Sequence, residues 1–124
     1  MRKVLVVEDS SAMRGLIASI VEQVDGCEVV EVSSGFDALR QLPREAFALI
    51  ITDINMPDIN GLELLSFVRK NPTYVKTPVL IVSTESSERD RQKGLALGAN
   101  AYLTKPFAPE ELRATVLRLL GGAA

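Results

Sequence analysis

Five short, mostly apolar segments, each followed by a longer segment with helical character, divide the chain and limit the folds it can adopt. The apolar segments cover residues 4–7, 27–32, 48–51, 79–82 and 101–103. Every residue of the 4–7 segment is apolar, which is typical of a strand buried on both faces of a parallel sheet. Strands that alternate with helices form right-handed crossovers, which place helices on both faces of one sheet. We therefore predict an α/β protein.

The intervening segments differ in how firmly they are expected to pack. In the first, apolar residues between positions 13 and 24 recur at spacings of 3, 1, 3, 1 and 3, which predicts an amphipathic helix. A second helix is predicted over residues 35–42, where Pro43 ends it. The fourth, over residues 88–97, is mostly polar and contains Gly94, which lowers its intrinsic stability by about 1 kcal/mol relative to alanine. This helix is expected to be weakly anchored.

Five strand–helix units, the last helix starting at Pro109, fill the 124 residues. Five units are too few for an eight-stranded barrel. The natural solution is an open, flavodoxin-like, doubly wound (βα)5 fold with parallel strand order 2-1-3-4-5 and a single domain over residues 1–124. Such sheets carry their functional groups at the carboxyl ends of the strands, beside the point where strands 1 and 3 become neighbours.

The composition excludes several classes of chemistry. The chain has no histidine, which removes a serine–histidine triad, imidazole metal ligands and a phosphohistidine within this chain. Cys27 is the single cysteine, so intramolecular disulfides are impossible and a reducing, cytoplasmic setting is expected. The net charge of −2 gives no general attraction to nucleic acid or anionic membrane, and the apolar runs are too short to span a bilayer. We expect neither as a direct partner.

Acidic residues follow two of the predicted strands that should be neighbours. Glu8 and Asp9 follow strand 1, Asp53 follows strand 3, and Lys105 follows strand 5. Three acids and one lysine leave two excess negative charges, which one divalent cation would cancel. Oxygen ligands without sulfur or imidazole favour Mg²⁺, with Mn²⁺ or Ca²⁺ also possible, and Mg²⁺ in proteins commonly holds a phosphate. A phosphoryl group is therefore the expected substrate.

Each of these residues also has an ordinary structural explanation. Glu8 and Asp9 could be charges that favour a helix N-terminus, Asp53 could start a turn, and Lys105 could be a solvated loop cation. Each explanation accounts for one position. None accounts for the expected convergence at neighbouring strand ends.

The same residues carry a resemblance to a known family. The motifs are Val6-Val7-Glu8-Asp9, Asp53-Ile54-Asn55-Met56-Pro57 with Gly61, Ser83, and Lys105-Pro106-Phe107. In this order they resemble the receiver domain of bacterial two-component response regulators. The resemblance covers essentially the whole chain, and it is greatest to stand-alone, chemotaxis-type (CheY-like) receivers.

The resemblance implies a role for each acidic residue. Asp53 matches the phosphoacceptor, which takes a phosphoryl group from a phosphohistidine on a sensor histidine kinase or phosphotransfer protein. Asp9 and Asp53 would bind Mg²⁺ through their side chains and Asn55 through its backbone carbonyl, with Glu8 acting mainly through water. Lys105 would bind a phosphoryl oxygen. The chain would be a signalling module, not an enzyme, since it assists only its own phosphorylation and dephosphorylation.

The resemblance also implies a conformational switch. Ser83 would donate to the phosphoryl group and draw the following loop inward, and Tyr102 matches the aromatic residue that then turns inward. Local backbone bonding and ordinary burial are the alternatives for these two residues. The downstream partner surface would comprise the 88–97 helix, strand 5 and the last helix, although an exposed polar helix is also expected on any soluble domain.

Three further residues match positions that modulate the reaction in the family. Thr84 stands where alanine is most common, so its bulk is expected to hinder small phosphodonors. Asn55 and Glu85 match residues that tune dephosphorylation. The resemblance also implies a cis peptide bond between Lys105 and Pro106.

Three other functions are weighed against this interpretation. An aspartate-nucleophile phosphatase of the dehalogenase class carries its nucleophile on the first strand and requires a second aspartate two residues later. In this chain Asp53 follows strand 3, and the residue two positions later is Asn55. A flavin carrier needs a phosphate loop after strand 1, where Glu8 and Asp9 would repel the ligand. A docking module of receiver type that works without phosphorylation stays open as the alternative.

Overall fold

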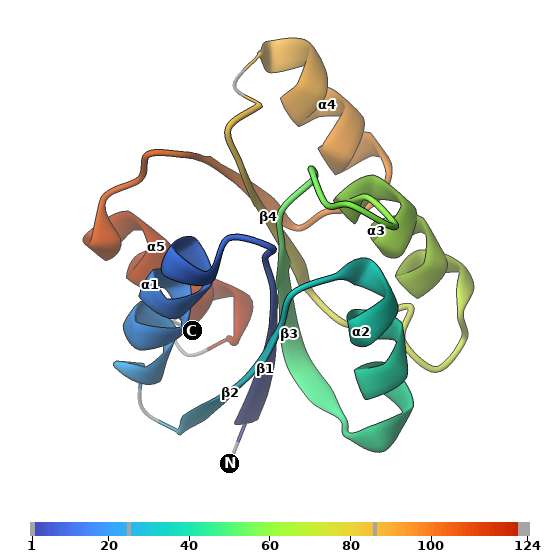
Figure 1. The fold of residues 1–124 in the computed structure, drawn as a ribbon, viewed down its shortest axis with the longest axis horizontal. Helices are drawn as coiled ribbons and strands as arrows, with labels where there is room; N and C mark the ends of the chain where they lie inside the picture. Colours follow the sequence, from blue (N-terminus) through green and yellow to red (C-terminus); the bar gives the residue numbers. More distant parts are fainter. Residues whose placement is uncertain (1, 25, 86, 122–124) are drawn as a thin grey trace.

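The computed structural model describes residues 2–24, 26–85 and 87–121. Within this part of the chain, five parallel strands form one sheet in the order β2-β1-β3-β4-β5 (Figure 1). The strands are β1 (Arg2–Val7), β2 (Cys27–Val32), β3 (Phe47–Thr52), β4 (Val79–Ser83) and β5 (Ala101–Thr104). The predicted fold class and strand order are confirmed.

Helices cover both faces of this sheet. They are α1 (Ser11–Glu22), α2 (Gly35–Gln41), α3 (Gly61–Lys70), α4 (Glu88–Ala96) and α5 (Pro109–Leu119). Helices α1 and α5 lie together on one face, and α2 and α3 lie on the other with α4 beyond them (Figure 1). Pro43 does not end α2 abruptly, since Leu42–Arg44 continues it as a 3-10 turn. Proline fits the first turn of a helix because its missing N–H would have no partner there.

The core is built from the central strands. Val4, Leu5, Leu49 and Ile50 have no exposed surface, and they alternate between two apolar clusters, one on each face of the sheet. Burying each such side chain contributes roughly 1.5–3 kcal/mol relative to leaving it in water. Strands β1 and β3 therefore form the most firmly packed part of the molecule, and the acidic residues follow directly from their ends.

Helix α4 is packed less firmly, as its sequence predicts. All its residues are described, and Gly94 alone among them is buried. A Cβ atom at Gly94 would lie 3.0 Å from the Ile81 side chain and 3.3 Å from the Tyr102 ring. The glycine thus lets α4 approach β4 and β5 closely without contributing a side chain to the core.

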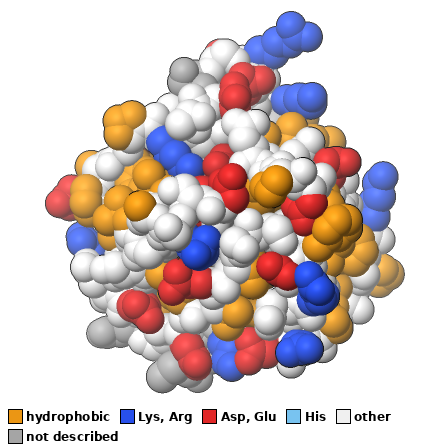
Figure 2. Space-filling view, in the orientation of Figure 1, with side chains coloured by type: hydrophobic (Ala, Val, Ile, Leu, Met, Phe, Trp, Pro, Cys, Tyr) orange, Lys and Arg blue, Asp and Glu red, His pale blue; other side chains and the backbone are white. Residues whose placement is uncertain are grey.

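On the face of the molecule shown in Figure 2, acidic and basic side chains are interspersed and are not segregated by sign.

Gly61 joins the start of α3 to the end of β3. Its N–H donates to the carbonyl oxygen of Ile54 over 2.8 Å, and a Cβ atom at Gly61 would lie 2.0 Å from the carbonyl oxygen of Asp53. No side chain fits in this space. The backbone that carries Asp53 is therefore fixed by direct contact with the first residue of α3.

We expect Gly61→Ala to lower the free energy of unfolding by about 3 kcal/mol, because the added methyl group must displace backbone atoms. Gly15→Ala is the matched control, since nothing lies within 4 Å of a Cβ at Gly15 inside α1. It should raise stability by about 0.5–1 kcal/mol through helix propensity. Urea unfolding followed by circular dichroism measures both. Equal stability of Gly61→Ala and the wild type would contradict this packing.

Candidate functional site

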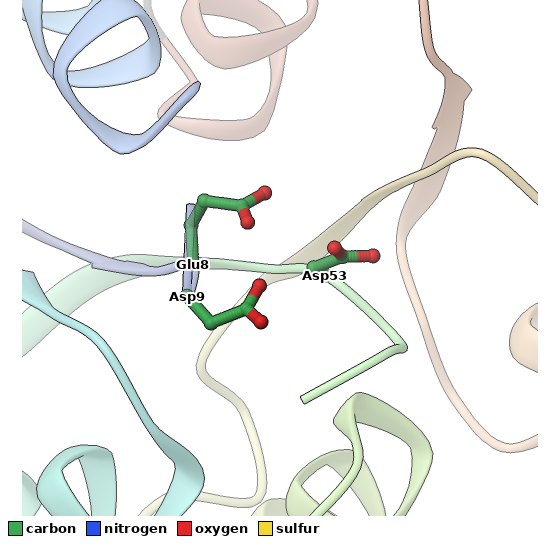
Figure 3. Close-up of side chains that lie close together, drawn as sticks. All are labelled: Glu8, Asp9 and Asp53. Atoms are coloured by element: carbon green, nitrogen blue, oxygen red, sulfur yellow. The ribbon is translucent and has the colours of Figure 1, made fainter. Parts of the chain in front are cut away.

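The sheet brings the ends of β1 and β3 side by side. The N–H of Asp53 donates to the carbonyl oxygen of Val7 over 3.2 Å, which aligns the residues that follow each strand. Glu8, Asp9 and Asp53 each offer a carboxylate oxygen within 4.8 Å of the others (Figure 3). The predicted convergence of these acids is confirmed.

Glu8 is buried, and both of its carboxylate oxygens have partners. Its side chain accepts a hydrogen bond of 2.6 Å from Lys105 Nζ and one of 3.0 Å from the Ser10 N–H. Its backbone carbonyl accepts from Arg14 Nη1 over 2.8 Å. Only 1% of Glu8 is exposed, so this carboxylate depends on these partners for compensation of its lost hydration.

The backbone after β3 folds back over the Asp53 side chain. Asp53 Oδ1 accepts from the N–H groups of Ile54 and Asn55, at 2.7 and 3.4 Å, and Oδ2 accepts from Lys105 Nζ at 3.2 Å. Asp53 is 8% exposed. The carboxylate is therefore held in one orientation at the edge of the site while it still reaches solvent.

Lys105 enters the site from the opposite end of the chain. The backbone N–H of Lys105 donates to the backbone carbonyl oxygen of Ser83 over 2.8 Å. The peptide bond from Lys105 to Pro106 is cis, as the resemblance implies. Burial alone would lower the pKa of the Lys105 ammonium, but the hydrogen bond to Glu8 and the charge of Asp53 outweigh it and raise the pKa above its ordinary value of 10.5. Lys105 is therefore a cation throughout the physiological range.

The charges of this site suit a divalent cation. Among the described residues, Glu8, Asp9 and Asp53 form a group able to hold a metal ion, and Lys105 neutralises only one of the three carboxylates. Asp9 is exposed, so the cluster opens to solvent on its side. Hard oxygen donors with an open side fit Mg²⁺, which uses few carboxylates and keeps several water ligands.

A second set of contacts extends from this site to the loop before α4. Ser83 is fully buried, and its hydroxyl oxygen accepts from the Glu85 N–H at 3.2 Å. The Glu85 carboxylate accepts from Asn55 Nδ2 at 3.1 Å, and the Glu85 carbonyl accepts from the Tyr102 hydroxyl at 2.6 Å. Thr84 is exposed beside them. The residues expected to act in switching and modulation therefore lie in the loop between β4 and α4 or contact it.

Two residues of this region were not expected from the sequence. Arg14 of α1 donates to the carbonyl of Glu8, and Asp58 connects the loop after β3 to α2. The two bonds of Asp58 join segments more than twenty residues apart, whereas the bond of Arg14 spans six residues. No motif or local spacing marks either residue, although Asp58 follows Pro57 in a loop where aspartate commonly bonds backbone N–H groups.

This combination of sheet, acidic cluster and strand-end lysine defines a receiver. The chain belongs to the response regulator receiver domain family, which matches residues 4–117. It is 38% identical over 120 residues to a chemotaxis protein CheY homologue of Campylobacter jejuni, with 96% of this chain and 92% of that protein covered.

Solved structures agree with this family. The chemotaxis response regulator CheY4 of Vibrio cholerae has a TM-score of 0.88 and 39% identity, with 96% of this chain and 98% of that chain covered. The Mn²⁺-bound form of response regulator Rcp1 has a TM-score of 0.80 and 27% identity, with 96% and 91% covered. The protein is thus a CheY-like receiver, a phosphorylation-activated signalling switch. No helix in the described part of the chain could cross a membrane.

We expect Lys105→Met to lower the free energy of unfolding by about 3 kcal/mol in the absence of divalent cations, because it leaves two buried carboxylates without their counterion. The raised pKa fixes the pH dependence: the stabilisation is complete at neutral pH and disappears as pH rises through the lysine pKa, above 10.5. Chemical unfolding of both proteins between pH 7 and pH 11 measures it. A stability difference that does not shrink at alkaline pH would contradict the assignment.

Proposed function

We propose that Asp53 is the phosphoacceptor and that it takes its phosphoryl group from a phosphohistidine on a sensor histidine kinase or phosphotransfer protein. The observation that carries the proposal is the meeting of three carboxylates within 4.8 Å, two of them bonded to Lys105. In the transfer, an Asp53 oxygen attacks phosphorus, the new O–P bond forms as the N–P bond breaks, and the donor imidazole leaves. Such transfer depends on positioning and charge neutralisation.

The proposed metal is Mg²⁺, with Mn²⁺ as a substitute. Asp9 and Asp53 would bind it through their carboxylates and Asn55 through its carbonyl, while Glu8, which accepts from the Ser10 N–H and from Lys105, would act mainly through water, as the resemblance implies. The bound cation would neutralise charge on the phosphoryl oxygens. The Mn²⁺-bound form of the relative Rcp1 supports a divalent cation in this fold.

Lys105 and Ser83 complete the proposed site. Lys105 Nζ lies 3.2 Å from Asp53 Oδ2, so a small movement would bring it to a phosphoryl oxygen carried by Asp53. The Ser83 hydroxyl oxygen accepts from the Glu85 N–H in this structure, and a hydroxyl that accepts one bond can also donate its proton, here to the same phosphoryl group. Both residues would therefore stabilise the phosphorylated form.

The proposed signal passes through Glu85. Donation by Ser83 to the phosphoryl group would move the loop before α4, and Tyr102 follows this loop through its bond to the Glu85 carbonyl. The α4–β5–α5 face would then change its packing and its affinity for a downstream protein. With the kinase as its phosphodonor, the switch would operate in the cytoplasm, where Cys27 stays reduced.

Intact-mass analysis after incubation with acetyl phosphate tests the acceptor. The wild type should gain one phosphoryl group in the presence of Mg²⁺ and none in EDTA, and Asp53→Asn should gain none, because the amide lacks the nucleophilic oxygen. Asp37→Asn, which changes an acid on α2 outside the site, is the matched control and should label like the wild type. If neither acetyl phosphate nor a phosphorylated phosphotransfer domain labels the wild type, the phosphorylation-independent docking module becomes the better interpretation.

Thr84 should limit access of small donors. Its exposed side chain follows buried Ser83 in the chain, at a position where the family most often has alanine. We expect Thr84→Ala to be phosphorylated severalfold faster by acetyl phosphate in a side-by-side time course. Thr84→Ser keeps the hydroxyl and removes only the methyl group, so an intermediate rate would attribute the effect to bulk. Equal rates for Thr84→Ala and the wild type would disprove it.

A further inference from the structure

The Asp58 carboxylate joins two segments that are far apart in the sequence. Its Oδ1 accepts from the N–H groups of Ile59 at 2.7 Å and Gly35 at 3.1 Å, and its Oδ2 accepts from the Phe36 N–H at 2.9 Å. The bond from Phe36, with those from Ile59 and Gly35, lowers the pKa of Asp58 below its ordinary value of 3.8. The side chain is therefore ionised and bonded to α2 at neutral pH.

These bonds provide hydrogen-bond acceptors for the N–H groups at the start of α2, and the acceptors come from outside that helix. The first N–H groups of a helix have no partner within it. In α2, Asp58 accepts from the first two residues, Gly35 and Phe36, and the Ser34 hydroxyl accepts from the third, Asp37, at 3.1 Å. Asp58 and Ser34 thus perform the same task for α2, but only Asp58 belongs to the loop after β3.

The backbones of α2 and this loop are also in direct contact. A Cβ atom at Gly35 would lie 2.8 Å from Ile59 Cβ and 2.9 Å from the Ile59 carbonyl oxygen. Residues 54–60 are therefore held at three places: at Asp53 by the Ile54 and Asn55 N–H groups, at Gly61 by its bond to Ile54, and at α2 by Asp58. Asn55 belongs to the first of these places, and Asp58 holds the loop three residues further along the chain.

We propose that Asp58 is a positioning residue for the divalent cation. By fixing the loop of residues 54–60 against α2, it would hold the Asn55 carbonyl in position for the cation that Asp9 and Asp53 would bind. The inference rests on the proposed function, in which Asn55 contributes that carbonyl as a ligand. Asp58 itself contacts no member of the acidic cluster, so its effect on the metal acts through the backbone.

A merely structural role for Asp58 makes a different prediction. If Asp58 only caps α2, its loss should lower thermal stability and leave the metal affinity unchanged, as loss of the Ser34 cap should. If Asp58 also positions the loop, its loss should weaken Mg²⁺ binding as well. The pair Asp58→Ala and Ser34→Ala separates these effects, because both variants weaken the same helix end and one of them releases the loop.

Isothermal titration of the metal-free proteins with MgCl₂, without a phosphodonor, measures the affinity, and thermal unfolding in EDTA measures stability. We expect the Kd for Mg²⁺ to rise roughly tenfold in Asp58→Ala, the scale of effects from residues that orient metal ligands. Ser34→Ala should lose stability and keep the wild-type Kd. Asp58→Asn, with one acceptor oxygen in place of two, should give an intermediate Kd.

A wild-type Kd in Asp58→Ala would overturn the inference. Should that variant fail to fold, Asp58→Asn decides by the same criterion. Asp9→Asn separates failure of this inference from failure of the proposed function. If the wild type does not bind Mg²⁺, or if Asp9→Asn binds it equally well, the metal site is wrong and the inference is lost with it. If Mg²⁺ binding is weakened by Asp9→Asn but unchanged in Asp58→Ala, only the inference is overturned.

Discussion

The contacts of Lys105 with Glu8 and Asp53 are the interaction on which the rest of the structure depends. Carboxylates crowded together and removed from water repel each other and lose hydration, so without a cation their burial would oppose folding. Lys105 supplies that cation from the end of β5, and it thereby connects the first and last strands of the βα series. One ammonium does not balance three acids. The remaining negative charge makes the site receptive to a divalent cation.

The molecule separates a rigid part from a responsive part. The acids follow strands whose last four residues are all buried, so their positions are set by the best-packed region of the core. The residues that would respond to phosphorylation lie on the other side of the site, in the loop before α4, where Glu85 is joined to both Asn55 and Tyr102. Local stability follows buried apolar contact, so the loop and α4 can move while β1 and β3 stay in place.

Much of this arrangement could be predicted from the sequence because it follows from periodicity and topology. The alternation of strands and helices gives the strand order, and the strand order brings Glu8, Asp9 and Asp53 together whatever the loops do. The bonds of Asp58 to α2 could not be predicted in this way, since they join the loop after β3 to the first residues of α2, and the approach of these segments depends on the three-dimensional packing of Gly35 against Ile59. The 3-10 turn at Leu42–Arg44 was missed because Pro43 is compatible with both a stop and a first turn.

The inward position of Tyr102 bears on how much free energy the switch requires. In this structure its ring already packs against Gly94, and its hydroxyl already donates to Glu85, so the inward arrangement is accessible without a phosphoryl group. Because the one buried residue of α4 is a glycine and not a large apolar side chain, alternative packings of α4 would differ little in buried surface. A hydrogen bond to a charged group contributes about 1.5–3 kcal/mol. One such bond, proposed from Ser83 to a phosphoryl oxygen, would therefore be enough to change the population of the two forms by a factor of ten or more.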